Sequence, residues 1–197
     1  MNVWSGKKYA VFIAIDQYND AAGVGDLQGC NKDANYVLER LVTSKQYDYE
    51  PIELKKGTSV LSDKEATQSG IQQLFEKCAE KVKQGDQLLV FMAGHGDPQG
   101  FLCHDHTKNN SKYISFKKLL HTVIYGENNK KPEDRRIKSA HVLFVIDACF
   151  SGTAISTKFH VAFKPSLHNQ EKFPPALHMM GSCDRDELSM EIVDEEQ

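Results

Sequence analysis

Three runs of apolar residues stand out along the chain, and none of them alternates with polar residues. They are YAVFIAI at 9–15, QLLVFMA at 87–93 and HVLFVID at 141–147. Runs of this kind are typical of strands buried on both faces, as in a mostly parallel sheet covered by helices. Two weaker runs, PIEL at 51–54 and PALHMMG at 175–181, are candidates for further strands.

Between these runs, apolar residues recur at the three- and four-residue spacing of an amphipathic helix. The segments with this spacing are 34–41, 71–82 and, more briefly, 115–120. Ser62 and Glu65 form a capping-box pattern that predicts the start of the second helix, and Gly85 predicts its end. Strands and helices therefore alternate, which predicts a doubly wound α/β sheet.

Length and composition fit one soluble globular domain rather than a nucleic-acid or membrane protein. The chain has 197 residues and a formal net charge of −3, so no basic surface is available for phosphate contacts, and we expect no nucleic-acid partner. No apolar run reaches the length that crosses a bilayer, and the run at 9–15 is too short for a leader. We expect no membrane partner either.

The cysteines point to a reducing compartment. There are five, widely spaced and without a CxxC pair, which excludes a disulfide framework or a zinc-knuckle pattern. We therefore expect a cytoplasmic protein with free thiols. The contiguous Cys103, His104, Asp105 and His106 suggest a metal, but neighbouring residues of an extended segment point to opposite sides. We predict no metal site there.

Two of the strong apolar runs end in reactive side chains. LLVFMAGHG leads to His95, and VLFVIDACFSG leads to Cys149. Ligands bind at the carboxyl ends of the strands of an open parallel sheet, so neighbouring strands would bring the two side chains to one edge. An imidazole can take the proton of a thiol and produce the thiolate nucleophile. The backbone amides of Gly96 and Cys149 are candidate donors to an oxyanion.

Each of these residues has a simpler interpretation when it is taken alone. Cys149 could be a small buried hydrophobe at the end of a strand, and His95 could be a hydrogen-bonded histidine in a turn. The pair, in this order and with 149 − 95 = 54 residues between its members, favours catalysis over both interpretations. No third group that orients His95 is evident, although the backbone carbonyl of a nearby residue could serve.

The sequence resembles the caspase and metacaspase superfamily of cysteine peptidases. The segments that carry the resemblance are KYAVFIAIDQY, LQGCNKDA, LLVFMAGHG, VLFVIDACFSG and, more weakly, HMMGSCDRDELSME. The resemblance implies a caspase-like three-layer sandwich over residues 1–197, with a mainly parallel central sheet and helices on both faces. It implies His95 and Cys149 as the catalytic dyad. Because relatives usually continue further, we expect a chain that is minimal, truncated or processed after residue 197.

The same resemblance bears on substrate choice. In metacaspase-like members the LxGCxxDA segment contributes an aspartate to the S1 pocket, here Asp33, and a second acid lies two residues before the cysteine, here Asp147. Paired carboxylates favour a cationic side chain, so arginine or lysine is expected at P1. The alternatives are an acid in the first turn of a helix for Asp33 and a structural strand-end carboxylate for Asp147. Asp16 is a weaker candidate for the same cleft.

Departures from the family pattern limit what the resemblance implies. Ala93 stands where metacaspases often have serine, DACFSG replaces the caspase QACxG, and no acidic cluster follows His95. We therefore expect no cofactor, and calcium is the alternative that stays open.

The function expected is an endopeptidase acting on protein substrates, regulated by processing or by an activating protein partner in cell-death or defence-type signalling. The basic segment 130–138 is a candidate autoprocessing site. A catalytically idle, caspase-like scaffold or regulatory binding module is the alternative. A nucleotide-binding domain has little support, since GxGxxG and GxxxxGK[ST] are absent.

Overall fold

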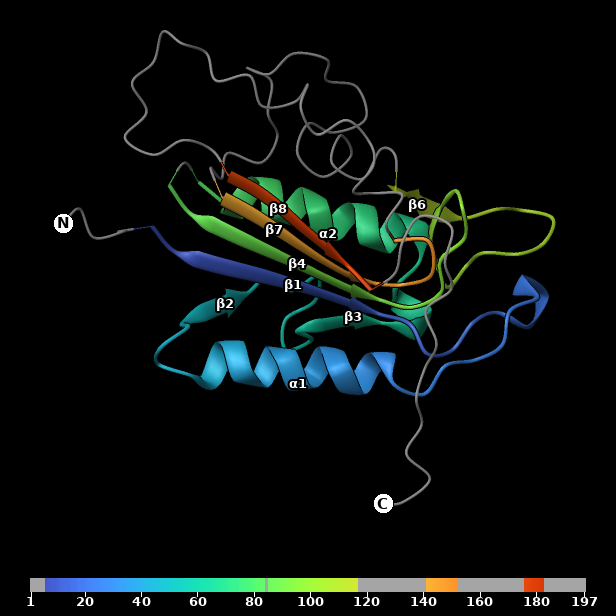
Figure 1. Cartoon of the computed structure of the whole chain (residues 1–197), viewed down its shortest axis with the longest axis horizontal. Coiled ribbons are helices and arrows are strands. Elements are labelled where there is room, and N and C mark those ends of the chain that lie inside the picture. Colours follow the sequence, from blue (N-terminus) through green and yellow to red (C-terminus); the bar gives the residue numbers. More distant parts are fainter. Residues whose placement is uncertain (1–5, 84, 117–140, 152–175, 183–197) are drawn as a thin grey trace, which may run out of the picture.

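Parallel strands in the order β2-β1-β4-β7-β8 form the centre of the computed structural model, and β3 also pairs with β1 (Figure 1). The structure describes residues 6–83, 85–116, 141–151 and 176–182. The strands of this sheet are β1 Lys8–Ala14, β2 Tyr49–Pro51, β3 Val60–Ser62, β4 Gln87–Ala93, β7 His141–Asp147 and β8 Ala176–Gly181. Every pairing within it is parallel.

The three strong apolar runs form the three central strands, as expected. β1 pairs with β4 over seven residues and β4 pairs with β7 over seven residues, so that Ala14, Ala93 and Asp147 form one row across the sheet. The weaker run at 175–181 forms β8, whereas the run at 51–54 contributes only its first residue to β2. β3 was not predicted from the sequence, because its three residues are too few to show a pattern.

Helices cover both faces of the sheet and confirm the three-layer sandwich. Helix α1, Cys30–Thr43, packs on the face that carries Ala10, Phe12, Leu89 and Phe91, which we call the α1 face. Helix α2, Gln68–Lys81, packs on the opposite α2 face, formed by every other residue of β1, β4 and β7. Strand residues therefore alternate between two apolar environments, which explains why the apolar runs show no alternation of apolar and polar residues.

The predicted start of the second helix at Ser62 is wrong. Residues Asp63–Glu65 form a single 3₁₀ turn, and the side chain of Ser62 makes no capping bond. Asp63 has a φ of 43°, and its carboxylate accepts the N–H groups of Asp16 and Gln17. The end of β1 therefore holds this residue in a conformation that cannot begin an α-helix. The α-helix begins at Gln68, where the Thr67 hydroxyl accepts the N–H of Gly70.

The helix predicted from Ser115 is also wrong at its start. Ser115 ends the strand β6, Tyr113–Ser115, which pairs with β5, Gly100–Leu102, in a separate two-stranded antiparallel sheet. The cross-strand pair of Phe101 and Ile114 is buried, and this burial favours the extended conformation over a helix. Residues 117–120 of that segment, the basic segment 130–138, Cys183 and the DELSME stretch lie outside the described residues.

Helices α1 and α2 have 14 residues each. Among the described residues, no helix combines the length and the apolar character needed to cross a bilayer.

Candidate active site

The tips of β4 and β7 lie side by side at the carboxyl edge of the sheet. Ala93 and Asp147 are paired, and the N–H of Gly94 donates to the carbonyl of Asp147 at 3.0 Å. His95 and Cys149 each follow this pair by two residues, so the structure brings both to the same edge on neighbouring strands. Both residues are half-buried and therefore accessible to a ligand.

The backbone of Gly96 lies against the turn that carries Cys149. A Cβ atom at Gly96 would be 2.2 Å from the carbonyl oxygen of Cys149, a distance that no real contact allows. Glycine at this position therefore permits the two tips to approach each other. The approach also places the two amides predicted as oxyanion donors, those of Gly96 and Cys149, on adjoining backbone segments.

His95 is held at both its backbone and its ring. Its N–H donates to the hydroxyl of Tyr18 at 2.7 Å, and its Nε2 lies 2.7 Å from the carbonyl oxygen of Gly25. A carbonyl oxygen only accepts, so this contact is a hydrogen bond when Nε2 carries the proton. In the neutral ring Nδ1 is then the nitrogen with the lone pair. The carbonyl that orients the ring is thus 70 residues away in the sequence rather than nearby.

The turn that carries Cys149 is fastened to the end of β8. Phe150 has a φ of 58°, and the N–H of Ser151 donates back to the carbonyl of Ala148 at 3.2 Å. The Ser182 hydroxyl accepts the N–H of Ala148 at 3.2 Å and donates to its carbonyl at 3.4 Å. Ser182, which is distant in the sequence, therefore fixes the backbone of Ala148, the residue before Cys149.

Ser182→Ala should loosen this turn without removing any reacting group. For the endopeptidase expected from the sequence, kcat/KM on a peptide substrate should fall by about fivefold, the effect of losing roughly 1 kcal/mol of hydrogen bonding. Steady-state kinetics at fixed pH, with a thermal melt beside them, checks this. Ser59→Ala, which removes a hydroxyl that donates to Glu53 away from the strand tips, is the matched control and should leave kcat/KM unchanged. Equal rates for wild type and Ser182→Ala would contradict the bracing role.

Of the two predicted S1 acids, Asp147 lies on the α1 face of the sheet, and Asp33 lies in helix α1, which covers that face. Asp147 continues the row of Leu143 and Val145, which pack on that face, and it is half-buried. Asp33 is in the first turn of α1 and is exposed. Helix α1 starts at the carboxyl edge of the sheet. Asp16, which follows β1 at that edge, accepts the N–H groups of the first two residues of the helix, and its carboxylate lies 2.8 Å from the N–H nitrogen of Cys30.

Asp16 itself has a structural role. Its carboxylate caps the first turn of α1 by accepting from Cys30 and Asn31, and its N–H is bound by Asp63. A carboxylate in this position satisfies backbone N–H groups that would otherwise lack a partner at the start of the helix.

The cluster Cys103 to His106 is built into the fold. Burial raises the pKa of the Cys103 thiol far above its ordinary value, so it stays protonated. Asp105 accepts the first N–H of α2 at 2.8 Å, and His104 Nδ1 lies 2.8 Å from the carbonyl of Gln17. Within the part of the chain that the structure describes, no group of three potential ligands could hold a metal ion.

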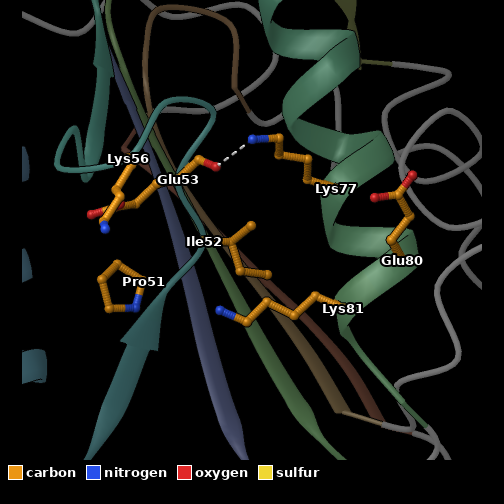
Figure 2. A pocket seen from close by; sticks show the side chains of 7 residues that line it. All are labelled: Pro51, Ile52, Glu53, Lys56, Lys77, Glu80 and Lys81. Carbon is orange, nitrogen blue, oxygen red and sulfur yellow. Dashed lines mark hydrogen bonds between the residues drawn. The ribbon is translucent and has the colours of Figure 1, made fainter.

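A surface pocket lies elsewhere, between the segment after β2 and helix α2 (Figure 2). The residues that line it are Pro51, Ile52, Glu53, Lys56, Lys77, Glu80 and Lys81. Lys77 Nζ donates to the carbonyl of Glu53 at 3.2 Å, and Lys81 is paired with Glu50. No candidate catalytic or S1 residue lines this pocket, so it belongs to a different part of the surface.

Three functional contacts were not foreseen from the sequence: those of Tyr18, Gly25 and Ser182. Tyr18 and Ser182 lie inside segments that carried the family resemblance, AIDQY and HMMGS, but nothing in their spacing links them to His95 or Ala148. All three contacts join residues that are distant in the sequence, so only the folded structure reveals them.

A protein-family model and a solved structure resemble this chain. The family model described as the caspase domain matches residues 7–197. Among curated proteins no match was found. The solved structures that resemble the chain include the crystal structure of a Geobacter sulfurreducens protein, with 14% identity and a TM-score of 0.47. The likeness covers 72% of this chain and 49% of that one, so the chain spans about half the length of that protein.

Proposed function

Because the chain belongs to the caspase-domain family of cysteine peptidases, we propose that it is an endopeptidase that cuts proteins after arginine or lysine. Cys149 is the nucleophile and His95 the general base. One observation carries the proposal: the pairing of Ala93 with Asp147 continues into the contact of Gly96 with the Cys149 carbonyl, so the two tips meet.

The proposed reaction begins with a proton transfer from the sulfur of Cys149 to Nδ1 of His95. The carbonyl of Gly25 supports this direction, because it engages Nε2 and leaves Nδ1 as the base. The thiolate then attacks the carbonyl carbon of the scissile peptide bond and forms a tetrahedral intermediate. Its negative oxygen accepts hydrogen bonds from the N–H groups of Cys149 and Gly96, which stabilise the charge that develops.

Collapse of the intermediate breaks the C–N bond. The leaving amine takes the proton from the imidazolium of His95, and the acyl group remains on Cys149 as a thioester. Water then attacks the thioester, again with His95 as the base, and restores the free thiol. Each protein group ends in its starting state, so the cycle consumes only peptide and water.

Asp33 and Asp147 support the proposed preference for a cationic P1 side chain. Asp147 ends β7 at the edge that carries Cys149, and Asp33 is in the first turn of α1, the helix that covers the same face of the sheet. Carboxylates in this position attract guanidinium and ammonium groups and repel an acidic P1 residue. Because Asp33 is exposed, its contribution is weakened by salt more than that of Asp147.

Asp33→Asn and Asp147→Asn should each lower kcat/KM for peptides with arginine or lysine at P1 by about 10²-fold, since each removes a charge that pairs with substrate. A positional-scanning peptide library at P1 checks this, with Glu80→Gln as the control because Glu80 is an exposed acid on α2, at the opposite face. An unchanged preference in both aspartate variants would overturn the assignment of S1. If wild type cleaves none of the peptides, the chain is the idle scaffold instead.

Regulation by processing or by a protein partner is part of the same proposal. The basic segment 130–138 offers bonds of the type the enzyme would cut, and it lies between β6 and β7 in the sequence. Regulated proteolysis of the cell-death or defence type would need such a step, because an unrestrained endopeptidase damages its own cell. We place the protein in a reducing, cytoplasmic compartment, where its thiol persists.

A further inference from the structure

The segment between β1 and α1 is a loop whose two ends are bound together. At its base the N–H of Leu27 donates to the carbonyl of Asp16 at 2.7 Å. Within it, the carboxylate of Asp26 accepts the N–H of Tyr18 at 2.9 Å, and Asn19 caps the 3₁₀ turn Asp20–Ala22. These bonds close residues 16–27 into one unit, which we call the β1–α1 loop.

Two residues of the β1–α1 loop, one near each end of the loop, contact His95. The Tyr18 hydroxyl accepts the backbone N–H, and the Gly25 carbonyl meets Nε2, each at 2.7 Å. In addition, the phenol and imidazole rings lie with centroids 4.9 Å apart at an angle of 48°. Asp26, which follows Gly25 in the chain, holds Tyr18, so the two contacts are coupled through a short piece of backbone.

The surroundings of Tyr18 keep its ring in one place. Tyr18 is 6% exposed and packs in the same apolar cluster as Phe101. Burial raises the pKa of its phenol well above the ordinary value, so the hydroxyl is uncharged throughout the range in which a protease works. A Cβ at Gly94 would be 2.8 Å from the Tyr18 hydroxyl and 3.0 Å from the Phe101 ring, so glycine there leaves room for the phenol.

We propose that Tyr18 is a positioning residue for His95, and that the β1–α1 loop, fastened by Asp26, sets the orientation and tautomer of the imidazole. The inference rests on the proposed function, because it assigns a purpose to the orientation of the catalytic base. Tyr18 does not touch the reacting atoms. It fixes the backbone from which the ring projects, and that keeps Nε2 on the Gly25 carbonyl and Nδ1 free to take the proton.

Tyr18→Phe removes the hydroxyl and keeps the ring. We expect kcat to fall by about tenfold while KM stays within about twofold, because a looser base affects the chemical step more than binding. Tyr36→Phe is the matched control. Tyr36 is an exposed tyrosine of α1 whose hydroxyl accepts from Arg40, and its loss should change neither constant.

Asp26 provides a second route to the same result that leaves Tyr18 intact. Asp26→Ala should reproduce the kcat loss of Tyr18→Phe. Asp26→Asn keeps an oxygen that can accept the N–H of Tyr18 and should restore most of the rate. This rescue separates positioning from general damage to the fold, and the Asp26 pair also serves if Tyr18→Phe does not fold.

An NMR measurement reports on His95 whether or not the protein cleaves peptides. The imidazole Nε2 proton of wild type should exchange slowly, because it is bonded to Gly25, and it should exchange faster in Tyr18→Phe and Asp26→Ala but not in Tyr36→Phe. Equal exchange and equal kcat in all variants would overturn the proposal for Tyr18. A wild type that shows the protected proton but no cleavage would instead overturn the proposed function and leave the positioning intact.

Discussion

Cys149→Ala should lower kcat/KM for cleavage after arginine or lysine by at least about 10⁴-fold, because the nucleophile has no substitute at that strand tip. Cys103 cannot replace it, since its thiol is buried and stays protonated. Peptide kinetics measure the loss of kcat/KM. In parallel, mass spectrometry of the intact protein shows whether any cut in the segment 130–138 of the wild type is absent from Cys149→Ala. A cut that persists in Cys149→Ala would mean that another protease makes it.

His95→Ala is the companion to this variant. It should cause a loss of similar size, and the double variant should be hardly worse than either single one, because nucleophile and base act in one step. Losses that multiply would contradict the dyad, since independent residues contribute separately. A residual rate equal to wild type in Cys149→Ala would remove the proposed function altogether.

Gly96→Ala should produce a smaller loss than the two dyad variants, similar in size to the loss expected for the S1 variants. Its Cβ would overlap the Cys149 carbonyl oxygen at 2.2 Å, and both atoms belong to rigid backbone, so the two strand tips must separate. A displacement of about 1 Å at a reacting centre lowers rates by about 10²-fold, and strain of this kind costs about 1–3 kcal/mol of stability. Peptide kinetics and a urea unfolding curve measure the two effects.

Gly57→Ala is the matched control, because a Cβ there meets nothing within 4 Å although the φ of 84° disfavours alanine. It should reduce the free energy of unfolding by about 1 kcal/mol and leave kcat/KM unchanged. The comparison therefore separates a general loss of stability from a loss of alignment at the strand tips. Full activity of Gly96→Ala would show that the tips tolerate separation, against the mechanism proposed.

The sequence predicted the central sheet well because its signal is strong and local. β1, β4 and β7 are continuous apolar runs. β1 and β4 are buried on both faces, whereas β7 is buried on the α2 face and half-buried on the α1 face. Because His95 and Cys149 follow the ends of two such runs, their place at one edge of the sheet was also predictable. The start of α2 was placed too early because the Ser62 and Glu65 pattern satisfies a local rule, whereas Asp63 is bound by the distant residues Asp16 and Gln17.

What could not be predicted are contacts between residues far apart in the sequence. Tyr18 and Gly25 reach His95 across 77 and 70 residues, and Ser182 reaches Ala148 across 34. The rules for hydrophobic periodicity and helix capping relate residues that are a few positions apart, so they contain no information on such distant pairs. The face of the sheet on which Asp147 lies was predictable. Alternate residues of a strand share a face, so Asp147 lies on the face of Leu143 and Val145.

The pairing of β7 with β8 has a consequence for the covalent state of the chain. These strands are linked in the sequence through residues 152–175, yet they share six residue pairs, and Ser182 is bonded to Ala148. A break of the peptide backbone anywhere in 152–175 would therefore create two polypeptides that still share one hydrogen-bonded ladder. Electrophoresis under denaturing conditions would separate them, whereas gel filtration of the native protein would give a single particle.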